Sequence, residues 1–345
     1  MPLTKVQSRG TENVGQGSSN VIINGAMNIA QRSTSETNRG DDTGYYVVDR
    51  WKLSTGASTA GRLTLSQDSS APSGFANSTK FDCTTADTSI ASGEFLQFEQ
   101  LIEGQNLQAF AKGTADAKPF AVSFYVKGNA SATYVCELFD ADNSRQISKT
   151  FNVTTDWTRV ELNFPADTTG TFDDDNASSL ALVIHLNAGS NYTSGTINSG
   201  SWASSTNANR VGSGTTSFFD STDRKFFITG VQLEVGSQAS DFQHEDIGTT
   251  LAKCQRYYQR WQANTAYDSV CTGSMYADTT WLGDYRLVPE MRAEPTFSAD
   301  GTFKVNASGG DMNASSFALN RATPQTIQFQ CTTTDANRIG QAGFF

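Results

Sequence analysis

Two aromatic side chains in a long polar loop are the residues of this sequence best suited to bind a ligand. Residues 187–217 are rich in Gly, Ser, Thr and Asn, and they include Tyr192 and Trp202. Loops of this length are commonly functional or disordered. An exposed ring can stack on a sugar face while neighbouring amides and hydroxyls bond the sugar hydroxyls. The loop therefore predicts carbohydrate binding, with the alternative that Trp202 anchors it to its own domain or to a neighbouring subunit.

The acidic residues give weaker support for a catalytic role. Cleavage of a glycosidic bond needs two converging carboxyl groups, one of them kept protonated by a raised pKa. Acidic residues in loops and on wet strand faces are usually solvated surface, so no pair is favoured over the others. The candidates are Glu94 with Glu99, Glu137 with Asp140, Asp284 with Glu290, and the run Asp173–Asp175.

Other catalytic signatures are missing from the sequence. The two histidines, His185 and His244, belong to no HExxH motif, and there is no Gly-x-Ser-x-Gly, Walker or dinucleotide motif. His185 falls within an apolar alternating segment and is expected to be a satisfied strand residue. We therefore predict a protein that is not an enzyme and that needs no cofactor.

Metal binding has one candidate, the acidic run Asp173–Asp175 followed by Asn176. Ca²⁺ prefers several carboxylate and carbonyl oxygens held by a loop. An acidic Asx turn explains the same residues more simply, and we favour it. The five cysteines form no CxxC pair, so buried free thiols are the expected state for Cys83, Cys136, Cys254, Cys271 and Cys331.

Composition and charge exclude several classes of function. The 345 residues carry a formal charge of −10, which repels duplex DNA, so nucleic-acid binding is disfavoured. The sequence contains no secretory signal and no run of about 18 apolar residues. We therefore expect a protein that is neither secreted nor inserted into a membrane. Only 17% of the residues are charged, and abundant Ser, Thr, Asn and Gly are typical of all-β proteins with many turns.

Alternating apolar residues predict the elements that carry these side chains. In 157–164, Thr158, Val160, Leu162 and Phe164 should face the core while Trp157 and Arg159 point outward. The same period of two recurs in about ten segments separated by turn residues. Two packed antiparallel sheets, a jelly roll, are therefore expected. The other predicted strands are 45–53, 62–66, 79–83, 95–102, 120–127, 133–139, 145–153, 180–186 and 229–235.

The chain divides into four predicted parts. Residues 1–20 are polar and glycine-rich, and we interpret them as a flexible attachment arm with contact candidates Val6, Gln7, Arg9 and Val14. The sandwich follows in 21–246, with Gln232 and Glu234 on an outward strand face. A short helical connector is predicted in 247–260, since Leu251, Cys254 and Tyr258 are spaced for one helix face. Residues 261–345 predict a smaller β domain with strands in 268–276, 279–287, 296–305 and 326–331.

Several phrases resemble predicted tail-fibre and appendage proteins of marine and cyanobacterial tailed phages. They occur in the family's order over about residues 20 to 300: Asn24–Arg32, Asp49–Trp51, Phe95–Gly104, Phe227–Gly236, Cys254–Tyr258 and Met291–Thr296. The resemblance implies a jelly roll like that of carbohydrate-binding modules, in a virion component that is often trimeric. It supplies no binding site, because these phrases look structural, and Trp51 is expected to cap a core.

The favoured hypothesis is a virion tail-appendage subunit, made in the host cytoplasm, that forms homo-oligomers and attaches to host polysaccharide or lipopolysaccharide. It would bind by multivalent weak contacts and touch other virion proteins through its arm. The late aromatic residues favour packing between subunits. Two alternatives stay open: a purely structural virion protein, such as a capsid decoration, head fibre or tail adaptor, and a polysaccharide depolymerase.

Overall fold

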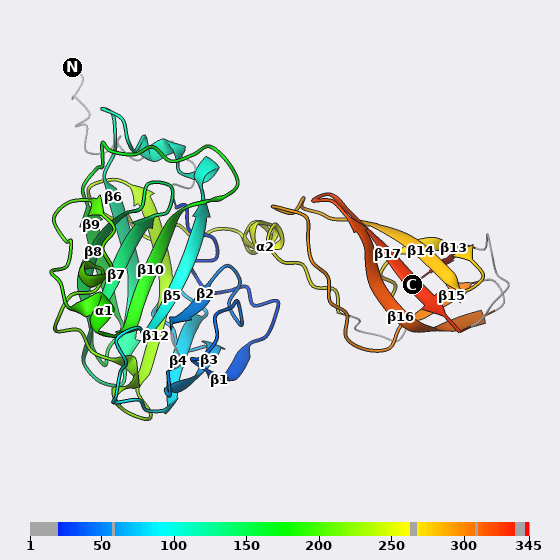
Figure 1. The fold of residues 1–345 in the computed structure, drawn as a ribbon, viewed down its shortest axis with the longest axis horizontal. Helices are drawn as coiled ribbons and strands as arrows, with labels where there is room; N and C mark the ends of the chain where they lie inside the picture. Colours follow the sequence, from blue (N-terminus) through cyan, green and yellow to red (C-terminus); the bar gives the residue numbers. More distant parts are fainter. Residues whose placement is uncertain (1–19, 57–58, 263–267, 308–309, 335–341, 345) are drawn as a thin grey trace, which may run out of the picture. The chain divides into compact units, whose positions relative to one another are not determined.

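A computed structural model describes residues 20–56, 59–262, 268–307, 310–334 and 342–344. The chain separates into two compact units, with the division between Asp246 and Ile247 (Figure 1). Each unit is described by itself below. Both are built almost wholly from antiparallel strands, which confirms the predicted all-β class.

The first unit contains a sheet whose strand order is β1-β3-β4-β12-β6-β9, with antiparallel pairing between all neighbours. Non-consecutive strands meet in its middle, because β12 returns from late in the sequence to lie between β4 and β6. The bounds are β1 Ser35–Arg39, β3 Arg62–Asp68, β4 Ser78–Thr85, β6 Phe120–Gly128, β9 Thr158–Phe164 and β12 Lys225–Val235.

The second sheet of this unit has the order β11-β8-β7-β10-β5-β2, again antiparallel throughout. Its central strand β10 carries buried residues on both faces, in contrast to a strand with one wet face. The bounds are β2 Lys52–Gly56, β5 Phe95–Glu103, β7 Ala132–Asp140, β8 Arg145–Val153, β10 Ser178–Ala188 and β11 Ala203–Ser204.

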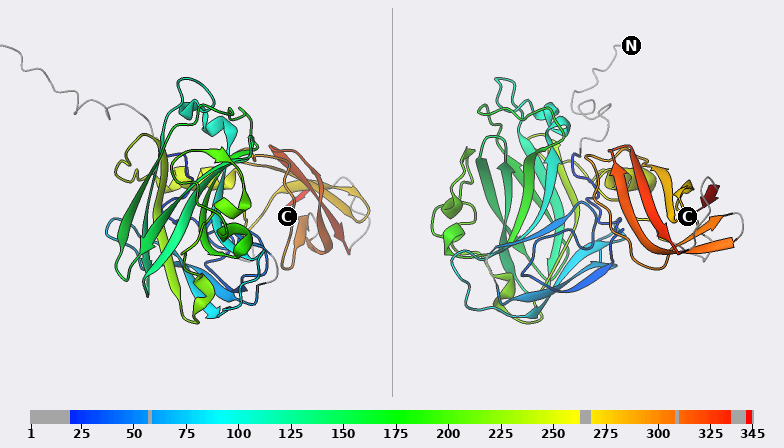
Figure 2. Two further views of the ribbon diagram at one scale, coloured as in Figure 1. Left: turned by 60° about the vertical axis from the view of Figure 1, so that its left-hand side comes forward. Right: turned by 45° about the vertical axis from the view of Figure 1, so that its right-hand side comes forward.

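One core lies between these two sheets, which can be followed as layers in Figure 2. It is dominated by aromatic rings, for example Phe81 edge-on to Phe98 and Trp51 stacked on Phe98. Trp51 is 1% exposed and therefore occupies the core position expected for it. Leu162 and Phe164 are buried while Trp157 and Arg159 lie outside, as the alternation predicts. The jelly-roll sandwich is confirmed.

The predicted strand at 45–53 is wrong for most of its length. The backbone turns at this point, with Trp51 bonding back to Val48 and Arg50 in the left-handed region at φ 73°. Val47 and Val48 are buried from this irregular loop, so their apolar side chains reach the core without a strand. Only 52–56 pairs with β5.

The family-like phrase that begins at Asn24 forms a structural corner. The Asn24 side chain accepts hydrogen bonds from the backbone N–H groups of Asn28 and Ile29 and donates to the carbonyls of Ile29 and Asp49. The indole N–H of Trp51 donates to the Asn24 carbonyl at 3.3 Å. The phrases that begin at Asn24 and at Asp49 therefore meet in space through the side chain and the carbonyl of Asn24.

Strand β12 changes its alternation at Gly230, where φ is +62° and the pairing register with β6 shifts. A Cβ at this glycine would lie 2.7 Å from the ring of Phe75, so a side chain has no space. Beyond the shift, Gln232 and Glu234 point outward as predicted. Both are nevertheless buried, because the segment after β12 covers them and Ser240 hydrogen-bonds the Glu234 carboxylate.

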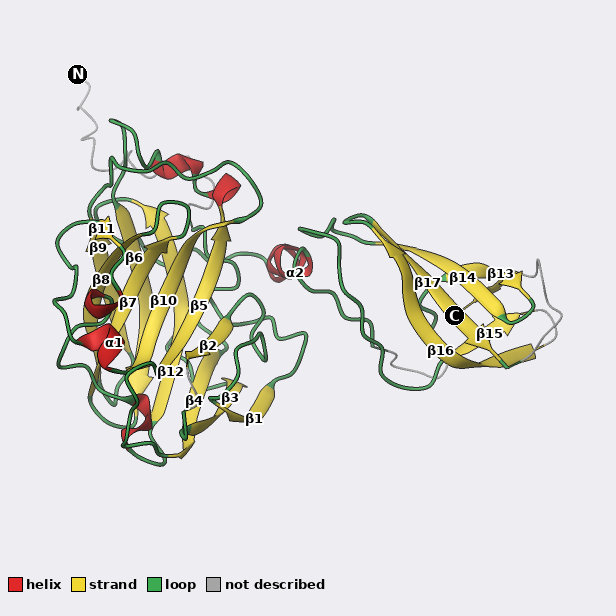
Figure 3. Ribbon diagram, in the orientation of Figure 1, coloured by secondary structure: helices red, strands yellow, loops and turns green. Residues whose placement is uncertain are grey.

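Helices are short and few among the described residues (Figure 3). Helix α2, Ile247–Gln255, opens the second unit and lies within the segment for which the sequence predicts one. None of the described helices is long and apolar enough to span a membrane. The others are α1 Ser190–Thr193 and the 3₁₀ turns η2 Gly104–Asn106, η3 Gln108–Phe110, η4 Asn207–Asn209 and η5 Phe218–Asp220.

The second unit is a closed barrel in the order β13-β14-β17-β16-β15-β18. Its core holds Trp281, Met312 and Phe329, all 0% exposed. The bounds are β13 Thr272–Ala277, β14 Thr280–Arg286, β15 Lys304–Ala307, β16 Gly310–Ala322, β17 Thr326–Thr333 and β18 Ala342–Phe344.

The prediction at 296–305 is wrong except at its end. Phe297 and Phe303 lie on irregular backbone and pack against Phe317. Their rings therefore contribute to the core although neither residue lies in a strand. Strand β16 was not predicted from the sequence because its Asn, Ser and Ala residues have low strand propensity. Pairing with β15 and β17 on its two sides holds it extended.

Candidate functional site

A row of side chains crosses the outer face of the sheet that contains β10. Glu137 on β7 pairs with Val183, Val183 with Glu99 on β5, and Glu99 with Lys52 on β2. Residues directly opposite in antiparallel strands point to the same face. The two glutamates therefore lie on one face, two strand spacings or about 10 Å of backbone apart.

Glu137 is completely buried on this face and is held by two basic groups. Arg210 binds its carboxylate through two nitrogens, with Nε–Oε1 at 2.9 Å and Nη2–Oε2 at 2.7 Å. His185 Nε2 lies 2.7 Å from Oε2. Burial by itself raises the pKa of Glu137, but the contacts from His185 and Arg210 outweigh it and hold the pKa below its ordinary value. The carboxylate is therefore a fixed negative charge.

A second set of contacts fixes the neighbouring strand residues. The amide nitrogen of Gln97 lies 3.3 Å from Nδ1 of His185. The Gln97 amide and the Glu137 carboxylate therefore contact the two ring nitrogens of His185. Glu99 is bound by the ammonium of Lys52 at 3.0 Å and by the hydroxyl of Ser54. His185 is a satisfied strand residue, as expected.

The 189–217 segment delivers the remaining groups to this face. It starts at Gly189, where a Cβ would lie 2.0 Å from the Ala91 carbonyl oxygen, so the close approach requires glycine. Helix α1 follows the end of the central strand β10 (Figure 1), and the ring of Tyr192 meets Phe95 of β5 edge-on at 5.4 Å. Arg210 lies over the ring of Phe139 at 5.2 Å.

These residues form what we call the Tyr192 face: Tyr192, Phe95, Glu99, Lys52 and Arg210. Two partly exposed rings stand beside two ion pairs whose carboxylates are buried. Strands and buried hydrogen bonds hold every charged group of the face, so little reorganisation is needed to contact a ligand. Arg210 is the only charged residue of the polar loop that supplies it, and this isolation is the sequence signal that could have singled it out.

Trp202 has a different place, and the expectation that it presents an exposed ring is wrong. Its side chain belongs to the core at 7% exposure, against Phe120 at 5.4 Å. The indole N–H donates to the Pro165 carbonyl at 2.9 Å. Burying a large apolar ring in the core stabilises the folded state, whereas a ring left in water does not. The loop therefore turns inward at Trp202. Trp202 anchors the loop to its own domain, and only Tyr192 stays available for sugar stacking.

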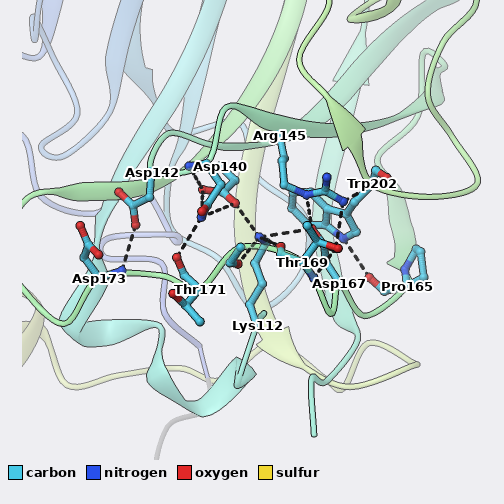
Figure 4. Close-up of polar contacts among 12 residues, drawn as sticks. Lys112, Asp140, Asp142, Arg145, Pro165, Asp167, Thr169, Thr171, Asp173 and Trp202 are labelled. Atoms are coloured by element: carbon cyan, nitrogen blue, oxygen red, sulfur yellow. Dashed lines mark hydrogen bonds and ion pairs between the residues drawn. The ribbon is translucent and has the colours of Figure 1, made fainter. Parts of the chain in front are cut away.

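The anchor lies beside a buried ion cluster, shown in Figure 4, formed by Lys112, Asp140, Asp167 and Arg145. The Lys112 ammonium is 0% exposed, 2.5 Å from Asp140 and 3.2 Å from Asp167. It also donates to two backbone carbonyls of the 169–170 turn, at 2.9 and 2.7 Å. All its donors are therefore satisfied by oxygen.

Arg145 joins this cluster to the 189–217 segment. It binds Asp167 through Nε at 2.7 Å and Nη2 at 2.9 Å, and Nη2 also donates to the carbonyl of Trp202 at 3.3 Å. Burial raises the pKa of Asp167, yet the hydrogen bonds from Arg145 and Thr169 and the Lys112 charge outweigh it, so the pKa is lowered. Nothing in the sequence around Lys112 indicated the carboxylates that pair with it.

The carboxylate pairs considered for catalysis are distributed over separate environments. Glu137 and Asp140 are taken up by the two buried ion networks described above. Glu94 is buried, and burial followed by the charge of Asp87 raises its pKa. The carboxylates of the second unit bond glutamine amides, Asp284 with Gln328 and Glu290 with Gln325.

The acidic run 173–175 is exposed and forms turns. The backbone N–H of Asp173 donates to the Asp142 carboxylate, and Asp175 accepts from the N–H of Ala177 through its side chain. This is the geometry of Asx turns. Among the described residues, no group of three or more His, Cys, Asp or Glu side chains is arranged to hold a metal ion.

We therefore expect calcium to leave thermal stability unchanged, since the described acidic side chains of this run are not arranged as a metal site. The measurement is the melting temperature of the full-length protein in excess chelator and in excess Ca²⁺. The two values should agree within about 1 °C, which is less than the shift of about 2–4 °C expected for 1 kcal/mol in a domain of this size. A rise with Ca²⁺ that Asp173→Asn removes would contradict this expectation.

The remaining predicted residues fall elsewhere. Val6, Gln7, Arg9 and Val14 lie outside the described residues. His244 packs beside Phe75 and Phe242 on the first unit. In the second unit, the late aromatic set includes the Trp261–Tyr285 pair, joined by a hydrogen bond of 2.9 Å. All five cysteines are free and buried, as predicted.

Comparisons with known proteins found similar solved structures but no similar sequence. No protein-family model and no curated protein sequence matches the chain. Among solved structures, the enzymatically active domain of tailspike protein 4 of bacteriophage CBA120 has a TM-score of 0.34 at 13% identity, covering 63% of this chain and 22% of that one. A family 11 carbohydrate-binding module from Clostridium thermocellum scores 0.29 at 12% identity, covering 61% and 99%.

A third structure, TmCBM61 with β-1,4-galactotriose, scores 0.33 at 12% identity and covers 64% of this chain and 100% of that one. Identities this low and TM-scores below 0.5 assign neither a ligand nor an activity to this chain.

Proposed function

We propose that the first unit binds glycans of a host cell surface through the Tyr192 face. This proposal is supported by the two partly exposed rings of Tyr192 and Phe95. They lie next to the Lys52–Glu99 and Arg210–Glu137 ion pairs. Aromatic rings stack on sugar faces, and fixed charged groups hydrogen-bond sugar hydroxyls. A surface organised in this way binds without having to order flexible side chains.

The setting that we propose is an appendage of a tailed-phage virion. Its support is the ordered set of phrases that resemble appendage proteins, together with the sandwich architecture that the resemblance implies. In this setting the chain forms homo-oligomers, with a trimer favoured, and contacts other virion proteins. Several weak sites on one particle then combine into strong attachment.

Binding without cleavage is part of this proposal. A glycosidase needs one carboxyl group that is protonated near neutral pH. Glu137 is held ionised by Arg210 and His185, and its pKa is lowered. Glu99 is already bound by Lys52 and Ser54. The acidic groups of the Tyr192 face therefore act as fixed hydrogen-bond acceptors in this proposal.

Binding to host lipopolysaccharide or capsule tests this function. Tyr192→Ala should weaken saturable binding by roughly three- to tenfold, because it removes a stacking surface. Tyr276→Ala is the matched control, since Tyr276 on β13 is 73% exposed and lies in the other unit. The readout is retention on immobilised polysaccharide at several protein concentrations.

The outcomes separate the alternatives. Binding that Tyr192→Ala leaves unchanged would reject the Tyr192 face. Failure of the wild type to bind any host glycan would favour a purely structural virion protein. Release of oligosaccharides would identify a depolymerase and overturn the proposed role.

A further inference from the structure

The outer face of the other sheet carries a second set of aromatic and basic side chains, which we call the Trp157 strip: Lys80, Phe227, Lys127 and Trp157. Phe227 of β12 pairs with Lys80 of β4 on one side and with Lys127 of β6 on the other. Both ammonium groups lie 6.0 Å from the centre of its ring. Trp157, which directly precedes β9, meets the same ring edge-on at 6.1 Å.

The charge of this strip is opposite to that of the protein. Lys80 and the adjacent Lys225 share one carboxylate, Asp82, at 2.8 and 3.6 Å. Lys127 has no carboxylate partner within the described part of the chain. Three ammonium groups therefore face one carboxylate, on a chain whose formal charge is −10.

We propose that the Trp157 strip binds polysaccharides that bear carboxylates, such as chains of uronic acids. Trp157 is partly exposed and offers a ring on which a sugar can stack. Lys127 then supplies a point charge for the sugar carboxylate. Lys80 lies on the other side of the Phe227 ring, across the sheet from Lys127, so a second ammonium group is available to the same polymer.

Charge and symmetry favour a uronic-acid chain over a nucleic acid and over a second copy of this protein. A nucleic acid carries a dense charge that the net charge of the chain repels beyond the strip. A second copy meeting this face about a two-fold axis would bring like charges together, since the same patch occurs on both partners. A uronic-acid chain has the opposite charge at lower density and presents sugar faces to Trp157.

This inference does not depend on the Tyr192 face, because the two sets of residues lie on different sheets. Failure of either can therefore be recognised separately. Tyr192→Ala should leave binding through the Trp157 strip unchanged, whereas changes at Lys127 should leave binding through the Tyr192 face unchanged.

The test compares polygalacturonate with its methyl ester, which has the same backbone without the charge. Full-length protein should bind polygalacturonate at least about fivefold more tightly, and added salt should reduce the difference. Lys127→Glu should abolish the preference, and Lys127→Gln should reduce it roughly twofold with less disturbance of the fold. Trp157→Ala should weaken binding to both polymers.

A matched control accompanies these variants. Lys118→Glu makes the same charge change at an exposed lysine outside the strip and should bind like the wild type. Equal binding of the two polymers, an unchanged preference in Lys127→Glu, or equally strong competition by duplex DNA would overturn the proposal.

Discussion

Replacing Lys112 by methionine is expected to destabilise the first unit by about 3–5 kcal/mol, the largest effect that we predict for a single substitution. The change keeps the apolar stem and removes the ammonium that Asp140 and two backbone carbonyls bind. Because both members of this ion pair are 0% exposed, the remaining carboxylate cannot turn to water. The measurement is the free energy of unfolding from urea titrations.

The two carboxylates of the cluster should respond unequally to this loss. Asp167 keeps its two hydrogen bonds from Arg145, whereas Asp140 keeps only contacts with Asn143. Asp140→Asn removes the uncompensated charge, so the double variant should be more stable than Lys112→Met alone. This outcome would show that the cost arises from a buried unpaired charge.

A matched control is Lys118→Met, which changes an exposed lysine and should alter stability by no more than about 0.5 kcal/mol. A loss below about 1 kcal/mol in Lys112→Met would contradict the prediction. So would a double variant that is less stable than the single one. Either result would mean that water reaches the cluster.

Glu137→Gln is the second large change, with an expected loss of about 2–3 kcal/mol at pH 7. It removes the carboxylate that clasps Arg210, the only charged residue of the polar loop. The loss is smaller than at Lys112 because the Arg210 side chain is 17% exposed and can turn toward water. Peptides from the 189–217 segment should then exchange backbone hydrogen faster.

The stability difference between wild type and Glu137→Gln should depend on pH in one direction. The folded state lowers the pKa of Glu137 below its ordinary value of 4.5, so its contribution is fully present above that value. It is lost as the pH falls through the lowered pKa, when the wild type also becomes neutral at this site. The gap should therefore be constant from pH 7 to about 5 and should narrow in acid.

The control for this experiment is Glu161→Gln, which breaks an ion pair with Arg159 on the surface. The Glu161 side chain is 48% exposed, so its loss should cost less than about 1 kcal/mol. A gap for Glu137→Gln that stays constant into acid, or hydrogen exchange that is unchanged in 189–217, would argue against Glu137 as the clasp of this segment.

The alternation of apolar residues by itself determined the fold class and most strands. At 145–153 the predicted bounds coincide with β8, and at 120–127 they miss β6 by one residue. This accuracy has a local cause, since side chains of a half-buried strand alternate between core and water. The same rule failed at 45–53 and 296–305, where irregular loops bury apolar side chains without pairing.

The ligand-binding candidates required the tertiary structure. Sequence alone identified the long polar loop and its rings, but only packing distinguished Trp202, buried against Phe120, from Tyr192 beside Phe95. Burial depends on which distant strands face a residue, and local composition does not carry that information.

Charge pairing was decided in the same way. Arg210 meets Glu137 across 73 residues of sequence, and Lys112 meets Asp140 across 28. The partner of each residue cannot be inferred from its neighbours in the sequence, because each pairing depends on strand order and register. The sequence determined that this chain would form packed antiparallel sheets. The tertiary structure decided which of its polar and aromatic groups became buried anchors and which remained available to a ligand.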